Sequence, residues 1–230
     1  MKGEYAAVMP LDRSSLALHL VQESQLRQRL EHEHLSTGIG PFDHAAGGVP
    51  RGAVTEVYGP ATCGKTTFLQ SFLAHATAAG EYCALIDGAD TFDPATAAQT
   101  GADLNRLLWV RCRNAEQALK AADLLVHSGG WGVITMDLTG IPSPMVRRIP
   151  MSWWYRFRRA VEHTPTAFLV LETEPYVKNC AAMTLEFPAA PPVWSGEHRD
   201  FRVLRGTEIQ VMPRKPMRLQ KTNFRARALA

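Results

Sequence analysis

Residues 54–66, VTEVYGPATCGKT, decide the fold of this chain. The run VTEVY is rich in β-branched residues and predicts a strand. Gly59–Thr66 then matches the pattern G-x-x-x-x-G-K-[ST], and Lys65–Ala79 has the composition of a helix. A glycine-rich loop of this pattern between a strand and a helix predicts a phosphate-binding loop rather than a chance turn.

Each part of this loop has a physical role in binding a nucleotide. Glycines let backbone N–H groups close around a phosphate without a clash from a Cβ atom. The N-terminus of the following helix adds partial positive charge. We expect the lysine to reach the β- and γ-phosphates and the threonine after it to bind Mg²⁺. The nucleotide-binding residues expected from the motif are Gly59, Pro60, Ala61, Thr62, Cys63, Gly64, Lys65, Thr66 and Thr67.

Asp137 is the expected second ligand of the magnesium ion, together with Thr66. It follows the apolar run of residues 131–136, WGVITM, which predicts a buried strand. A carboxylate at the carboxyl end of such a strand, beside a phosphate loop, can hold Mg²⁺ through its water shell. Taken alone, Asp137 would more often be a turn residue, but the phosphate loop favours the metal.

Short apolar runs alternate with helical segments along the chain. Strands are expected at Val54–Tyr58, Cys83–Ile86, Val133–Met136 and Ala167–Leu171, and helices at Lys65–Ala79, Ala115–Ser128 and Ser152–His163. This alternation predicts an α/β fold with a mainly parallel central sheet and helices on both faces. Beyond Pro188, runs at Phe201–Leu204 and Glu208–Met212 predict antiparallel edge strands. We expect residues 1–35 to be an N-terminal helical segment, with a helix over 14–31, and residues 36–230 to be the core.

Composition excludes several classes of protein. Of 230 residues, 46% are hydrophobic and 20% charged, which is enough apolar material for a core and excludes a disordered polymer. No run of about 18 apolar residues predicts a membrane span, and the N-terminus does not resemble a signal peptide. The four cysteines form no C-x-x-C pair, which fits a reducing compartment. We therefore expect a cytoplasmic protein without a membrane contact.

The formal charge of +3 is unevenly distributed. Arg199–Ala230 carries nine Lys and Arg against two acidic residues, a charge of +7, which leaves 16 basic and 20 acidic residues, −4, in the rest. A basic tail fits an anionic partner such as nucleic acid or an acidic protein, and it fits equally a solvated pair of basic strands. Residues 153–159, WWYRFRR, could stack on bases, but helical spacing favours a buried face of Trp154, Phe157 and Val161 with the arginines opposite.

An ordered series of segments resembles the core of the RecA recombinases. These segments are Ser36–Gly38, Gly47–Gly52, Glu56–Pro60, Gly64–Thr67, Cys83–Asp87, Phe92–Pro94, Glu116–Leu119 and Asp137. The similarity runs from about Ser36 to about Leu138 and continues more weakly to about Phe187. The resemblance implies a RecA-like ATPase core that takes ATP and Mg²⁺, with Asp93 at the adenine amino group.

The sequence also departs from the RecA pattern. Ala89 stands where the resemblance implies a water-activating glutamate, and loss of such a group typically slows a reaction by ~10²–10⁴-fold. Asp90 and Glu172 are weak substitutes for it. Thr96 stands where an aromatic residue would stack on adenine. The glutamine that senses the γ-phosphate corresponds to Glu172 or to Thr173. The two DNA-binding loops shorten to about 141–150 and 173–181.

Within the RecA relatives, the chain is most similar to the ImuA type. The short first loop, the run PMSWWYRFRRAVEHT at 150–164 and the compact basic C-terminus carry this similarity. It implies an accessory factor for error-prone translesion synthesis in damage-induced (SOS) mutagenesis, near the nucleoid, with weak or no ATP hydrolysis. The implied partners are a polymerase-like repair protein or a recombinase, single-stranded DNA, and a second copy through the N-terminal helix. The residues expected to bind DNA or a partner are Arg147, Arg148, Lys178, Arg214, Lys215, Arg218 and Lys221.

Two other functions remain open at this point. One is a minimal DNA-dependent ATPase or recombinase that binds single-stranded DNA. The other is a non-catalytic regulator of recombinase filaments. Ala89 and the short loops favour the accessory factor or the regulator over the recombinase.

Overall fold

The computed structural model describes residues 33–195, 203–216 and 219–227. The chain divides between Glu33 and His34, and the unit described below begins at His34. The helix expected over 14–31, and with it the expected self-association segment, lies outside the described residues. None of the helices in the described ranges is long and apolar enough to cross a membrane.

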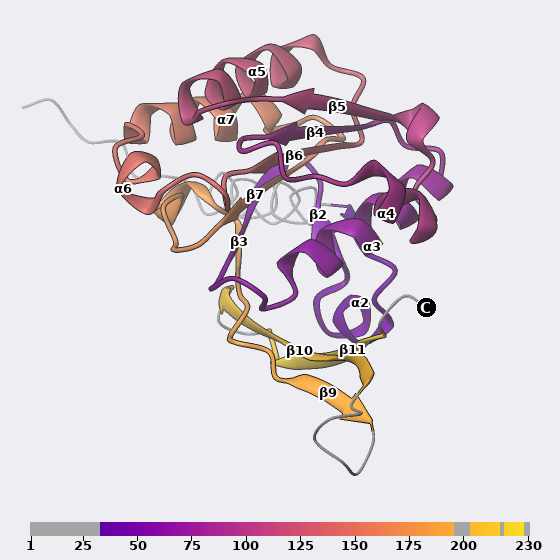
Figure 1. Cartoon of the computed structure of the whole chain (residues 1–230). Coiled ribbons are helices and arrows are strands. Elements are labelled where there is room, and N and C mark those ends of the chain that lie inside the picture. Colours follow the sequence, from indigo (N-terminus) through magenta and orange to yellow (C-terminus); the bar gives the residue numbers. More distant parts are fainter. Residues whose placement is uncertain (1–32, 196–202, 217–218, 228–230) are drawn as a thin grey trace, which may run out of the picture. The chain divides into compact units, whose positions relative to one another are not determined.

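Six parallel strands form the centre of the fold (Figure 1). In spatial order they are β8 (Met183–Glu186), β3 (Ala53–Tyr58), β7 (Ala167–Glu172), β6 (Val133–Asp137), β4 (Cys83–Asp87) and β5 (Leu107–Arg111). The predicted parallel sheet is confirmed, and its four predicted strands are correct to within one residue. Strands β5 and β8 were not predicted, because β5 is only partly buried and β8 is short.

An antiparallel extension completes the sheet beyond β8. The long strand β10 (Val203–Lys215) pairs with β8 near its carboxyl end, and with β11 (Thr222–Arg227) and β9 (Pro192–Ser195) over the rest of its length. The prediction of antiparallel edge strands is therefore confirmed. Of the run expected at Phe201–Leu204, the first two residues lie outside the described part of the chain; Val203 and Leu204 belong to the same strand as the run expected at Glu208–Met212.

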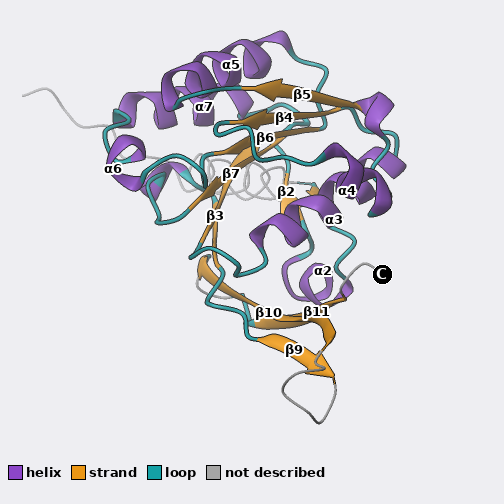
Figure 2. Ribbon diagram, viewed as in Figure 1, coloured by secondary structure: helices purple, strands orange, loops and turns teal. Residues whose placement is uncertain are grey.

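Helices cover both faces of the sheet (Figure 2). The described residues form two hydrophobic cores, one on each face of the sheet. On one face α5 (Ala115–Ser128) and α7 (Met151–Val161) pack on the first core, and on the other face α3 (Lys65–Ala78) and α2 (Gly40–Ala46) pack on the second. A strand can supply both cores because its side chains alternate between the faces: in β4, Ala84 and Ile86 belong to the first core, and Cys83 and Leu85 belong to the second. The remaining elements are short: β1 (His34–Leu35), β2 (Val49–Pro50), α4 (Pro94–Gln99), η1 (Leu104–Arg106), α6 (Ser143–Val146) and η2 (Lys178–Cys180).

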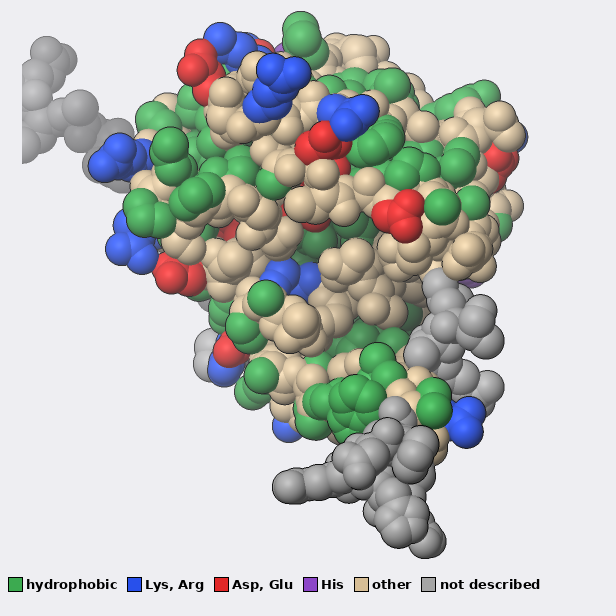
Figure 3. All heavy atoms as spheres, viewed as in Figure 1, with side chains coloured by type: hydrophobic (Ala, Val, Ile, Leu, Met, Phe, Trp, Pro, Cys, Tyr) green, Lys and Arg blue, Asp and Glu red, His purple; other side chains and the backbone are tan. Residues whose placement is uncertain are grey.

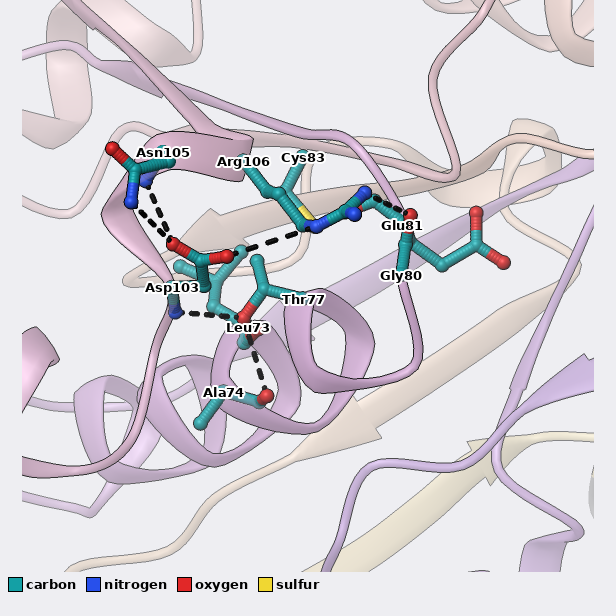
Figure 4. Close-up of polar contacts among 9 residues, drawn as sticks. All are labelled: Leu73, Ala74, Thr77, Gly80, Glu81, Cys83, Asp103, Asn105 and Arg106. Atoms are coloured by element: carbon teal, nitrogen blue, oxygen red, sulfur yellow. Dashed lines mark hydrogen bonds and ion pairs between the residues drawn. The ribbon is translucent and has the colours of Figure 1, made fainter.

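Polar contacts fix the start of β5 to the end of α3 (Figure 4). The backbone N–H of Asp103 donates to the hydroxyl of Thr77 at 3.0 Å, and the Asp103 carboxylate accepts from Asn105 at 3.0 Å. Arg106 donates to the carbonyl oxygen of Gly80 at 2.7 Å. Since α3 begins at the phosphate loop, these contacts tie the outer strand of the sheet to the helix that carries that loop.

The aromatic residues of α7 belong to the core, as helical spacing predicted. Trp154, Phe157 and Val161 are buried against the sheet, whereas Tyr155 is 54% exposed. Trp154 and Phe157 make an edge-on contact, and the ring of Phe157 packs at a tilt of 59° against that of Phe168 of β7, with their centroids 5.5 Å apart. The stretch 153–159 is therefore a core-forming helix face, and the stacking interpretation does not apply to its buried rings.

Neighbouring residues of α7 give a test of this packing. We expect Trp154→Ala to lower the free energy of unfolding by about 3–5 kcal/mol, because it removes a fully buried indole and leaves a cavity. Tyr155→Ala should leave the unfolding midpoint close to that of the wild type. Urea unfolding followed by circular dichroism measures both, and equal effects of the two substitutions would contradict this assignment of the helix faces.

Candidate nucleotide-binding site

The phosphate loop between β3 and α3 has a backbone conformation that depends on its glycines. Gly59 has φ 155°, Thr62 has φ 60° and Gly64 has φ 97°. A Cβ atom on Gly59 would lie 2.1 Å from the carbonyl oxygen of Phe187, and one on Gly64 would lie 2.5 Å from the Cδ1 atom of Ile209. Both glycines are thus required by their close neighbours as well as by backbone conformation.

The N-terminus of α3 and the Lys65 ammonium form the positive part of the loop. Gly64 precedes the helix and has no side chain to cap the N–H groups of the first turn. Lys65 is buried, and its Nζ donates to the carbonyl oxygens of Gly59 at 2.5 Å and Pro60 at 2.8 Å. N–H groups without a side-chain cap beside a buried ammonium fit an anionic phosphate group.

A cavity of about 830 Å³ opens above this loop, within the usual size of a small-molecule site. Figure 3 shows this face hollowed between the helical layer and the strands β9 and β10. The phosphate loop contributes Ala61–Thr67, the segment after β4 contributes Thr91, Phe92, Asp93 and Thr96, and the end of β6 contributes Asp137, Thr139 and Gly140. The remaining lining residues are Leu69, Gln70, Thr173, Ala190, Pro192, Leu204, Thr207 and Ile209.

Asp137 lies in the cavity wall together with Thr66. One oxygen of its carboxylate accepts from the backbone N–H of Thr139 at 2.9 Å and from the Thr139 hydroxyl at 2.6 Å. Burial raises the pKa of Asp137, while the bonds from Thr139 and the charge of Lys65 act in the opposite direction. A carboxylate and a hydroxyl in one cavity are oxygen ligands of the kind that Mg²⁺ takes, so these residues fit that ion.

A family comparison agrees with this geometry. The model of the RecA N-terminal domain matches residues 14–146. The chain belongs to the RecA family. RecA from Roseiflexus sp. (strain RS-1) is 38% identical over 138 residues, which are 59% of this chain and 39% of that protein. RecA from Haemophilus ducreyi is 41% identical over 119 residues, 51% of this chain and 32% of that protein. The chain thus spans only about a third to two fifths of the length of these relatives.

Ala89 occupies the position where the RecA resemblance implied a glutamate. Its methyl group lies beside Gly140, because a Cβ atom on Gly140 would lie 2.3 Å from the Cβ of Ala89. Gly140 itself lines the cavity. At this position the RecA-family chain therefore has an alanine, which has no proton-accepting group; Ala89 contacts the lining residue Gly140 but is not itself among the lining residues of the cavity.

The two aspartates beside Ala89 hold the loop after β4. The buried carboxylate of Asp87 accepts from the N–H groups of Ala89, Thr91 and Phe92 and from the indole of Trp109, at 2.8–3.3 Å. Asp90 instead forms a two-bond ion pair with Arg111 of β5 at 2.6 Å, and this bond lowers the pKa of Asp90. Asp90 is not among the lining residues of the cavity.

Asp93 both caps a helix and lines the cavity. Its carboxylate accepts from the backbone N–H of Ala95 at 3.0 Å and from the Thr96 hydroxyl at 2.5 Å. The bond from Thr96, followed by that from Ala95, lowers the pKa of Asp93. The resemblance to RecA implied that Asp93 contacts adenine, and the geometry leaves both this contact and the capping role available to it.

Glu172 and Thr173, at the carboxyl end of β7, lie in different surroundings. Thr173 lines the cavity, and its hydroxyl lies 2.9 Å from that of Ser143 in the first loop. Glu172 is buried, is absent from the cavity lining, and accepts from the backbone N–H of Tyr176 at 3.1 Å. Of the two positions that sequence left open for a γ-phosphate sensor, Thr173 is the one at the cavity.

The predicted DNA- or partner-binding residues fall into two groups. Arg147, Arg148 and Lys178 are exposed on the segments 141–150 and 173–181, which are joined by an ion pair of Arg147 with Glu174 at 2.9 Å. Arg214, Lys215 and Lys221 lie on or after β10, and Arg218 lies outside the described residues. Arg214 pairs with Glu186, and the Lys215 ammonium donates to the carbonyl oxygen of Ala181.

The wall that β9 and β10 contribute to the cavity was not predicted from the sequence. Pro192, Leu204, Thr207 and Ile209 line the cavity, and Trp194, which is half exposed, lies directly opposite Leu204 across the strand pair. Figure 3 shows hydrophobic side chains gathered over these strands. No short motif marks these residues, because their place depends on antiparallel pairing far along the chain.

Asp87 and Asp90 allow a matched test of the loop after β4. We expect Asp87→Ala to destabilise the fold by about 3 kcal/mol, because it removes a buried carboxylate and leaves four partly buried N–H donors without their acceptor. Asp90→Ala removes only an exposed ion pair and should leave the urea midpoint near that of the wild type. If Asp90→Ala proved the more damaging substitution in urea unfolding, Asp87 would not be the anchor of this loop.

Proposed function

We propose that this RecA-family chain binds ATP with Mg²⁺ in the cavity above the phosphate loop. The observation that carries the proposal is that Lys65 and the N-terminus of α3 line that cavity. The phosphates would take the N–H groups of this helix end, and Thr66 and Asp137 would hold the ion. Bound Mg²⁺ would neutralise charge on the β- and γ-phosphates.

The same cavity offers surface for the nucleobase. Phe92, Leu204 and Pro192 line it with apolar surface, and Asp93, which also lines it, offers a hydrogen-bond acceptor. A carboxylate can accept a bond from the amino group of adenine, and it has no donor for a carbonyl oxygen at the same place. On this proposal Asp93 is the residue that favours adenine. Apolar contact with the base takes the place of the aromatic stacking that is lost because Thr96 stands at the position of the aromatic residue.

We further propose that hydrolysis is weak or absent. Lys65 and Asp137 serve binding, whereas Ala89 offers no group that could take a proton from water. Asp90 is engaged by Arg111, and Glu172 is enclosed in the core. Neither of the substitutes considered from sequence therefore lies where it would contact water in the cavity.

The biological role that we propose is that of an accessory factor in DNA repair. Membership of the RecA family supports a role in repair or recombination, and the ImuA-type resemblance supports action beside an error-prone polymerase in SOS mutagenesis. On this proposal ATP sets a conformation or an assembly state, and a polymerase-like partner performs the synthesis. Self-association through residues 14–31 and a location near the nucleoid belong to the same proposal.

The surface proposed to bind single-stranded DNA or the partner is the loop pair of residues 141–150 and 173–181. Arg147, Arg148 and Lys178 are exposed there. The Ser143–Thr173 contact joins this loop pair to the cavity wall. A nucleotide that moved Thr173 would therefore also act on the loops that carry the cations, and this link supports coupling between ATP and the partner.

Removal of the Lys65 ammonium tests nucleotide binding. We expect Lys65→Ala to weaken ATP binding by about ten- to a hundredfold or more, because charge-assisted hydrogen bonds contribute about 1.5–3 kcal/mol. Lys120→Ala, which removes an exposed lysine of α5 paired with Glu116, should bind ATP as the wild type does. Isothermal titration calorimetry in the presence of Mg²⁺ measures both, and unchanged affinity in Lys65→Ala would refute the site.

Restoration of a carboxylate at position 89 tests the proposed lack of hydrolysis. We expect slow ATP turnover by the wild type with and without single-stranded DNA. Ala89→Glu should raise the turnover rate by ~10²-fold or more. Ala89→Gln is the matched control, because it crowds Gly140 equally but supplies no base. Strong DNA-stimulated turnover by the wild type would overturn the accessory role and favour a minimal recombinase.

A further inference from the structure

Two carboxylates lie together in the interior of the protein. Glu56 of β3 and Glu172 of β7 are each 1% exposed. Tyr58 lies opposite Glu172 in the parallel pair of β3 and β7, so Glu56 and Glu172 are diagonal neighbours on one face of the sheet. Val54 and Val170, which share this face, belong to the core beneath α5 and α7. Neither carboxylate is a lining residue of the cavity.

The hydrogen bonds of this pair leave one oxygen without a partner. Glu56 accepts from the backbone N–H of Val177 at 2.7 Å and from the hydroxyl of Thr184 at 3.3 Å. Glu172 accepts from the backbone N–H of Tyr176 at 3.1 Å through one oxygen. Its other oxygen, Oε1, is buried and has no hydrogen-bond partner. An ionised carboxylate can only accept, so an acceptor buried in this way is costly.

The two carboxylates have no ion-pair partner in the described part of the chain. In the part of the chain that the structure describes, the ion pairs include neither Glu56 nor Glu172. Lys215 of β10 donates to a backbone carbonyl of residue 181, and Arg158 of α7 pairs with Glu162 at 3.7 Å. The thiol of Cys180 on η2, which responds to the charge of Glu56, is itself uncharged at neutral pH because burial raises its pKa.

Two adjacent negative charges in an apolar core are more costly than one charge and one neutral acid. We propose that Glu56 and Glu172 share a single proton, and that this proton holds the turn of residues 173–177 against β3. With a proton on the pair, the partnerless oxygen gains a partner in the other carboxyl group. Burial raises the pKa of both groups, and for Glu172 the charge of Glu56 adds to the effect.

The turn fixed in this way links the proposed nucleotide site to the basic loops. Both N–H groups bound by the pair, those of Tyr176 and Val177, belong to it. The same turn carries Thr173 in the cavity wall and Glu174, the partner of Arg147. Glu56 and Glu172 are therefore positioning residues, which act on the cavity and on the loop surface through the turn.

The titration of the wild-type protein tests the shared proton directly. With the glutamate carboxyl carbons labelled with ¹³C, nuclear magnetic resonance follows each carboxyl group of the full chain against pH. We expect one carboxyl group to remain protonated well above the ordinary glutamate pKa of 4.5. If every glutamate ionises near that ordinary value, the proposal is wrong. This measurement needs no substitution and no nucleotide, so its outcome is independent of the proposed ATP site.

Stability against pH gives a second test, with a defined sign. The folded state holds a proton that the unfolded chain releases above pH 4.5, so the pair's contribution to stability falls as pH rises through this window. One proton corresponds to a tenfold change of the folding equilibrium constant per pH unit, up to the raised pKa of the pair. We expect Glu172→Gln to remove this component, because its amide donates to Glu56 at every pH.

Glu174→Gln is the matched control for that substitution. It removes a carboxylate from the same turn, but an exposed one, so the fall in stability above pH 4.5 should remain as in the wild type. Amide hydrogen exchange then reports on positioning. The protection of the Tyr176 and Val177 amides should fall with rising pH in the wild type and in Glu174→Gln, and persist in Glu172→Gln. If the protection of these amides depended on pH in the same way in the wild type and in Glu172→Gln, the shared proton would not hold the turn, and the proposal would be wrong.

Discussion

The parallel register of four strands is the constraint on which the rest of the structure depends. Asp87 of β4 lies opposite Asp137 of β6, Asp137 opposite Leu171 of β7, and Glu172 opposite Tyr58 of β3. Each strand therefore ends at the same edge of the sheet, where the phosphate loop also begins. In open α/β sheets ligands bind beyond this edge, because loops from several strands meet there without a layer of helices above them. The cavity, the acidic residues and the basic loops all follow from that shared edge.

Three carboxylates at this edge differ in chemistry because the strands give them different neighbours. Asp87 is surrounded by N–H donors and acts as the anchor of a loop. Asp137 receives two bonds from Thr139, has Lys65 close enough to affect its pKa, and faces open space. Glu172 has one donor and a second acid. Environment rather than residue type thus separates the anchor of a loop, the metal ligand of the proposed site and the group that we propose to retain a proton.

Local patterns predicted the parts of the fold that local physics determines. The phosphate loop, the strand that precedes it and the helix that follows it are fixed by glycine conformation and hydrophobic periodicity, and they were predicted within one residue. The single strand β10 was predicted as two runs, because pairing of Gly206 and Thr207 with both β9 and β11, not propensity, keeps the strand continuous between them. The cavity wall at Leu204 and Ile209 depends on the same pairing. The choice between Glu172 and Thr173 needed only strand alternation, since adjacent residues at a strand end point to opposite faces.

The combination of a phosphate-loop lysine, Lys65, with an alanine at position 89 has a consistent physical meaning on the proposed function. The lysine and the helix N-terminus act on the bound ground state as well as on any transition state, and so they contribute to affinity. A general base acts mainly on the barrier, so its absence leaves affinity intact while turnover becomes slow. On this proposal the protein does not consume the nucleotide that it binds, and the bound state rather than the hydrolytic cycle becomes the signal. The link from Thr173 to Ser143 gives such a bound state a route to the loop surface, and the Glu56–Glu172 pair fixes the turn from which that route starts.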